Sequence, residues 1–219
     1  MKLRTTTMIA LAFIGLFIVS CTSKEEKAAK LIRNELSKTL YDFDSYNPIE
    51  TKVKEAKSTA FNDSTCWNKA NVLAYGLNDM VEKVHAVTNA AEHMAIWGRP
   101  SYYSSSYSDS QYYKYKRELD EAVSEANLAI IICNKLAKEL SVLINKLDTS
   151  QVVGWEVTHD FRCKTKGGSS EIGHYRYVIN KKFDAVILCE DVEGKRDEDA
   201  RAVIEKVMNG WDELSTIDI

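Results

Sequence analysis

Two long apolar repeats in the middle of the chain constrain its fold more than any other feature. In each repeat, apolar residues recur at alternating steps of three and four, which keeps one stripe of an α-helix against a partner helix. The first repeat consists of Cys66, Ala70, Leu73, Leu77, Met80, Val84, Val87, Ala91 and Met94. The second consists of Tyr112, Tyr115, Leu119, Ala122, Ala126, Ala129, Cys133, Leu136, Leu140, Leu143 and Leu147. Each repeat predicts a long helix with one packed face.

The two predicted helices follow each other directly, which favours an antiparallel helical hairpin, coiled-coil-like, over residues 66–148. Gly98 and Pro100 end the first helix, and the second is expected to begin near Ser110. Arms of this length would extend on the order of 50 Å. Further apolar residues lie off the second stripe and predict contact with the β-region or with the first helix of the chain: Val123, Ile130, Ile131, Val142 and Ile144.

The hairpin register bears on the four cysteines beyond residue 21. With a turn near residue 104, Cys66 and Cys133 would be separated by roughly 15 Å along the axis, which is too far for a disulfide. Both are expected to act as small apolar residues. Cys163 and Cys189 fall in neighbouring segments of a predicted sheet, so a disulfide between them stays open.

Outside the hairpin the pattern changes to short alternating segments. The expected elements are helices over 24–41 and 197–211, an extended entry and edge strand within 42–58, and strands over 155–163, 171–179 and 185–189. The predicted fold class is therefore α+β. A long antiparallel hairpin is inserted into a small antiparallel sheet of three or four strands, with helices flanking it at both ends of the chain.

The first residues have the pattern of an export signal. Lys2 and Arg4 precede an apolar run, and Ile18-Val19-Ser20-Cys21 closes it. These last four residues resemble a bacterial lipobox, which implies cleavage before Cys21 and attachment of a diacylglyceryl group to its thiol. The predicted organisation is a signal peptide over 1–20, a membrane-proximal α+β domain over 21–65 and 149–219, and the hairpin over 66–148. An ordinary secretory signal and an uncleaved anchor are the alternatives.

The charge of the chain argues against nucleic acid as a partner. The formal net charge is −3, and removal of Lys2 and Arg4 with the signal takes it to −5. No basic face for phosphate contacts is evident. A lipidated chain would belong to the bacterial cell envelope, at the outer membrane. The short acidic run after Cys21 resembles a surface-export signal, but the periplasmic and surface faces both stay open.

The chemically interesting side chains give no catalytic, metal or cofactor site. His159, Asp160 and Arg162 are close in sequence, but alternation in a strand sends His159 to one face and the other two to the opposite face. His85 and His93 lie near one side of the first hairpin helix without a third ligand. Both groups are interpreted as ordinary surface or sheet residues.

A tyrosine- and serine-rich segment falls at the expected distal end of the hairpin. Such a composition is typical of adaptable recognition loops. The candidate partner-binding residues are Tyr102, Tyr103, Tyr107, Tyr112 and Tyr113. A flexible, solvated loop is the alternative interpretation.

Short motifs in the outer segments resemble a family of uncharacterised bacterial lipoproteins. They are Ser45-Tyr46 with Pro48-Ile49, then Val157, His159, Phe161, Arg162 and Lys164 in one strand, and Tyr175, Tyr177 and Ile179 in the next. The resemblance covers about 80 residues and implies one small α+β domain, with the hairpin inserted after its first strand. No activity is attached to that family.

The leading hypothesis is a membrane-anchored envelope lipoprotein that acts, without catalysis, as a binding or structural module through its hairpin. The expected contact is an envelope protein or a surface glycan. The alternative is an enzyme or small-ligand carrier whose site lies between sheet and hairpin, lined by His159, Arg162, Tyr175 and Tyr177. A purely structural subunit of an envelope complex is the third hypothesis.

Overall fold

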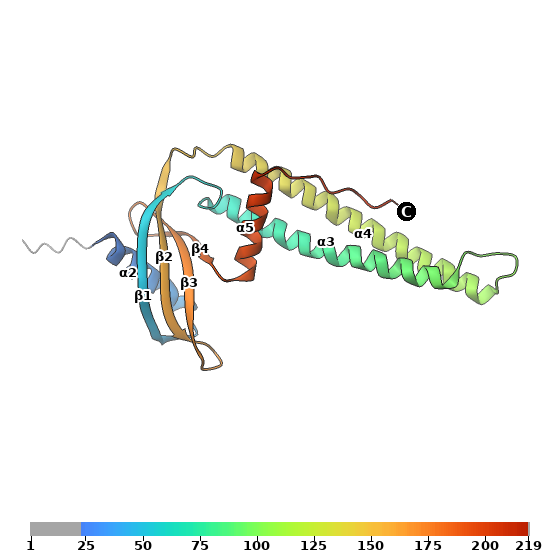
Figure 1. Cartoon of the computed structure of the whole chain (residues 1–219), viewed down its shortest axis with the longest axis horizontal. Helices are drawn as coiled ribbons and strands as arrows, with labels where there is room; N and C mark the ends of the chain where they lie inside the picture. The colour runs from blue at the N-terminus through green and yellow to red at the C-terminus, as the bar shows by residue number, and fades with distance from the viewer. Residues whose placement is uncertain (1–22, 219) are drawn as a thin grey trace, which may run out of the picture.

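The structure, a computed structural model, places a four-stranded antiparallel sheet at one end and a long helical hairpin at the other (Figure 1). It describes residues 23–218, so the predicted signal peptide and Cys21 lie outside the described residues. The elements are α2 (Lys24–Thr39), β1 (Asp42–Lys57), α3 (Ser64–Trp97), α4 (Ser106–Asn145), β2 (Val152–Lys164), β3 (Ser170–Asn180), β4 (Val186–Asp191) and α5 (Lys195–Met208). The predicted α+β fold class is confirmed.

The strands follow one another in the order β1-β2-β3-β4, and each pairs antiparallel with the next. β1 is an edge strand, as expected, and the segment expected as its extended entry is part of the strand, which runs from Asp42 to Lys57. The register shifts on both sides of Pro48, between Asp42 and Asn47 and between Pro48 and Glu50. A proline is tolerated here because an edge strand leaves one row of its backbone groups unpaired.

Each face of the sheet carries its own core. On one face α2 packs over the sheet, with buried Ala28, Ile32 and Leu36 against Val157, Phe161, Tyr177 and Ile179. On the other face the root of the hairpin and α5 bury Val178 and Leu188. Since Val178 points one way and Tyr177 and Ile179 the other, β3 is covered on both sides at this level.

The hairpin packs along the predicted stripes. Three residues of the hairpin are completely buried: Cys66, Ala70 and Ala137. The arms also pack closely at Gly76, where an added Cβ would lie 3.4 Å from Sγ of Cys133 on the other arm. Cys66 and Cys133 are buried free thiols, which confirms that they pack and do not pair. Burial raises the pKa of Cys66 to about 12, so this thiol stays protonated and unreactive.

The apolar residues off the second stripe have different environments. The C-terminal tail runs along α4, where Asn127 bonds to Ile217 and Asn134 to Leu214. Ile130 is buried, as predicted, but the expected partner was wrong: besides α3, α4 contacts mainly α5 and the C-terminal tail in place of the sheet or α2. The prediction was wrong for two others, because Ile131 is 55% exposed and Val142 is 46% exposed.

Two helix ends differ from the predicted ones by three or four residues. α4 begins at Ser106 instead of Ser110, because the hydroxyl of Ser105 accepts a hydrogen bond from the backbone of Ser108 and caps the helix earlier. α5 ends at Met208, and Trp211 follows in the tail, where its indole N–H donates to Asn134.

The sheet register separates the two remaining cysteines. Cys163 on β2 is opposite Glu171, whereas Cys189 on β4 is opposite Tyr177, and β3 lies between them. Six residues along β3 correspond to about 20 Å, so the disulfide that the sequence left open does not form. Both are free thiols.

A buried ionic cluster joins the sheet to the hairpin root and to α5. Glu190 on β4 is 2% exposed and accepts hydrogen bonds from Arg176 on β3 and Arg201 on α5. Arg176 also donates to the side chain of Asn62 and to the carbonyl of Phe61, each at 2.8 Å. These last two residues belong to the turn that leads into α3.

Removal of the central carboxylate should destabilise the fold strongly. We expect Glu190→Ala to lower the free energy of unfolding by about 3–5 kcal/mol, since it leaves the buried Arg176 with only the more distant carboxylate of Glu156, 3.9 Å away. Glu193→Ala is the matched control, because Glu193 is 70% exposed, and it should change stability by less than about 0.5 kcal/mol. Urea unfolding followed by circular dichroism measures both. Equal stability of the two variants would contradict the role given to Glu190.

Candidate functional site: the groove and tip of the hairpin

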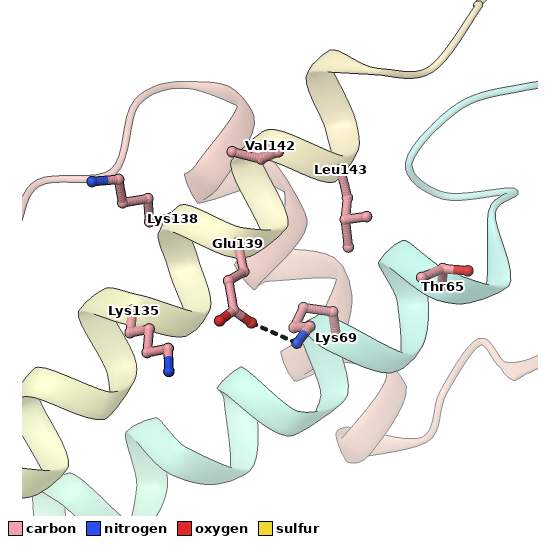
Figure 2. Close-up of a pocket in the computed structure, with 7 residues that line it drawn as sticks. All are labelled: Thr65, Lys69, Lys135, Lys138, Glu139, Val142 and Leu143. Carbon is pink, nitrogen blue, oxygen red and sulfur yellow. Dashed lines mark hydrogen bonds and ion pairs between the residues drawn. The ribbon is translucent and has the colours of Figure 1, made fainter.

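A groove with a volume of about 680 Å³ lies between α3 and α4 at the hairpin root (Figure 2). We call it the root groove. Its lining residues are Thr65 and Lys69 from α3, and Lys135, Lys138, Glu139, Val142 and Leu143 from α4. The lining residues of each helix are neighbours because residues three and four apart on a helix share one side. The groove is therefore a product of helix pairing.

The root groove combines an apolar wall with positive charge. Lys69 and Glu139 form an ion pair of 2.8 Å across it, which Figure 2 shows as a dashed line. Lys135 and Lys138 form no ion pair with the described residues. Such a surface suits an amphipathic partner that carries acidic side chains. Sequence reasoning missed this groove, although the exposed Val142 on a helix face with two lysines was the available signal.

The tip of the hairpin presents aromatic side chains to solvent. Tyr102 and Tyr103 are 96% and 94% exposed, and their rings meet edge to face with centroids 5.4 Å apart. The connecting loop is shorter than predicted, so Tyr107 also lies on α4, in the turns before Tyr112 and Tyr113. Tyr107 packs its ring edge-on against Trp97 at the end of α3.

The four residues expected to line a site between sheet and hairpin are not brought together there. His159, Tyr175 and Tyr177 lie on the sheet face that α2 covers, and Arg162 lies on the opposite face. A hollow of about 440 Å³ does lie between the sheet and the hairpin root, next to Arg176 and Arg201. The guanidinium of Arg176 already bonds to Glu190, Asn62 and Phe61 there.

His159 is a buried structural residue. It is 0% exposed, and its two ring nitrogens are each 2.8 Å from a hydroxyl oxygen, one of Tyr46 and one of Thr51. Phe161 and Tyr46 stack near the ring. Burial lowers the pKa of His159, because the charged imidazolium loses its hydration there.

The other histidines considered in the sequence also have ordinary structural partners. Asp160 lies on the face opposite His159, as expected, and pairs with His174 at 2.9 Å. His93 packs on Tyr115 within the hairpin. Among residues 23–218, no three His, Cys, Asp or Glu side chains are placed to hold a metal ion.

Comparison with known proteins adds no relationship: no family model, no curated protein and no solved structure matches the chain. Within the part that the structure describes, no helix combines the length and apolar character needed to cross a membrane.

The environment of His159 predicts a loss of stability in acid. The folded protein holds the ring neutral, whereas the unfolded chain takes up a proton near pH 6.5. Below that pH the unfolded state binds more protons, so the free energy of unfolding should fall by up to about 1.4 kcal/mol per pH unit from this residue. We expect His159→Gln to be less stable at pH 7.5 and to lose this dependence.

Chemical unfolding at pH values from 5 to 7.5 measures the effect as a difference between wild type and variant. His174→Gln is the control with opposite sign, because the hydrogen bond to Asp160 raises the pKa of His174 and stabilises the folded state at acid pH. A difference between wild type and His159→Gln that does not change with pH would contradict the prediction.

Proposed function

We propose that the protein is a lipid-anchored lipoprotein of the bacterial cell envelope that binds a partner through its helical hairpin, without catalysis. The partner is a protein or a glycan of the envelope. The lipobox-like Ile18-Val19-Ser20-Cys21 supports the anchor. The form of the structure supports the binding role, because the hairpin projects from the sheet as a long arm (Figure 1).

The position of the first helix suits an anchor at Cys21. α2 begins at Lys24, and Ser23 and Glu26 form a reciprocal capping box at its start. Folded structure thus follows the proposed lipidated residue closely. A body tied this way would sit near the membrane at its sheet end, with the tip of the hairpin on the far side of the molecule.

The exposed tyrosine pair at the tip is the observation that carries the binding proposal. Tyr102 and Tyr103 hold almost all of their surface in solvent. Burial of a large aromatic side chain against a partner contributes much binding free energy, and its entropy cost is low because few bonds lose their freedom of rotation. A tip that only joined two helices would not need them.

The anchor is tested by incorporation of labelled palmitate in a bacterial host. We expect label in the wild-type chain and none in Cys21→Ala, because the thiol is the acceptor. Cys189→Ala is the matched control, since it removes a different exposed cysteine and should keep the label. Equal labelling of wild type and Cys21→Ala would contradict the anchor.

The binding role is tested by a photo-crosslinking amino acid placed at position 102 of the anchored chain in intact cells. We expect a discrete crosslinked product, and we expect Tyr103→Ser in the same chain to reduce its yield several-fold. The same probe at Tyr75, which is 77% exposed on the side of α3, is the control. Crosslinks of equal yield from both positions would contradict a specific binding site at the tip.

A further inference from the structure

An exposed side of α4 has a repeat of its own. Glu121, Ser124, Leu128, Ile131, Lys135 and Lys138 are all exposed, and they recur at steps of three and four. We call these six residues the outer face of α4. A heptad repeat keeps one stripe directed at one neighbour along the whole helix, and no part of the described chain covers this stripe.

The centre of the outer face is apolar. Leu128 is 59% exposed and Ile131 is 55% exposed, and the adjacent Ile132 is 45% exposed. Three neighbouring large aliphatic side chains on one helix are a contiguous patch, which on a soluble surface marks an interaction site more often than scattered single residues do. The root groove continues this patch through Lys135, Lys138 and Val142.

The charges on the two sides of the apolar centre have opposite sign. Towards the tip lie Glu121 and the neighbouring Glu125, and towards the root lie Lys135 and Lys138. Within the chain, each of these two glutamates has one basic partner at longer range: Arg117 is 3.9 Å from Glu121, and Lys83 is 3.3 Å from the exposed Glu125. A uniformly charged lipid surface would repel one half of this pattern.

From this arrangement we propose that a second copy of the chain docks antiparallel on the outer face of α4. In a two-fold symmetric pair, Leu128 of each copy faces Ile131 of the other, and the two apolar centres close on each other. Glu121 then faces Lys138 of the other copy, and Ser124 faces Lys135. The surface is complementary to itself, as a two-fold interface requires.

A parallel pair would place like charges opposite each other along the whole stripe, so the charges select the antiparallel direction. The stripe from Glu121 to Lys138 spans about 25 Å, which is short for a permanent dimer. The association is therefore reversible, and the high local concentration of anchored chains in a membrane favours it. This self-association is independent of the contact proposed at the tip.

The test uses the full, anchored chain carrying two different tags in the same membrane, with a photo-crosslinking amino acid at position 128. We expect a crosslinked product that contains both tags. The same probe at Tyr75, on α3, should give none. Ile131→Glu, at an exposed position that does not support the fold, should abolish the product because it puts a carboxylate into the apolar centre.

Charge reversal identifies the partner as a second copy. Glu121→Lys and Lys138→Glu should each reduce the crosslinked product about tenfold, because each creates two like-charged pairs per dimer. A mixture of the two variants, one with each tag, should recover it, since both pairs are then opposite in charge. Lys116→Glu is the matched control on another side of α4 and should have little effect.

Two results would overturn the proposal. Loss of the product in both single variants without recovery in the mixture would show that the face binds something other than a second copy. A product from position 128 that joins the chain only to a different protein would show the same directly.

Discussion

The arrangement of sheet and hairpin depends on one carboxylate, that of Glu190, buried between Arg176 and Arg201. A charge at this depth is tolerable only when it is paired and fully hydrogen-bonded. The two arginines come from β3 and α5, and Arg176 also holds the turn at Phe61 and Asn62 that begins the hairpin. Four segments are therefore fixed to one another at a single point, which sets the direction in which the hairpin leaves the sheet.

From that point outward the hairpin is supported unevenly. α5 and the C-terminal tail cover one side of its root, whereas the tip and the outer face of α4 have no cover within the described chain. The three surfaces to which we give functions are consequently far apart: the N-terminal end of α2, the tyrosine tip and the side of α4. A chain held at one end can expose the other two at the same time.

Sequence reasoning was most accurate where structure depends on near neighbours. The heptad stripes gave the hairpin, and alternation placed His159 and Asp160 on opposite faces of β2 correctly. It was least accurate at element ends and between elements. The start of α4 depends on a cap at Ser105, and the length of β1 depends on pairing with a strand about a hundred residues away.

The fold class, the hairpin and its packed stripe follow from the order of the residues, because helix and strand periods are local properties of the chain. Which of the remaining apolar residues are covered depends instead on contacts between distant segments. Ile130 and Ile131 are adjacent and chemically identical, yet Ile130 is buried and Ile131 is 55% exposed, on the helix where the C-terminal tail binds Asn127 and Asn134. The path of the tail depends on Asn127 and Asn134 binding backbone far along the chain, and such long-range contacts leave no periodic signal.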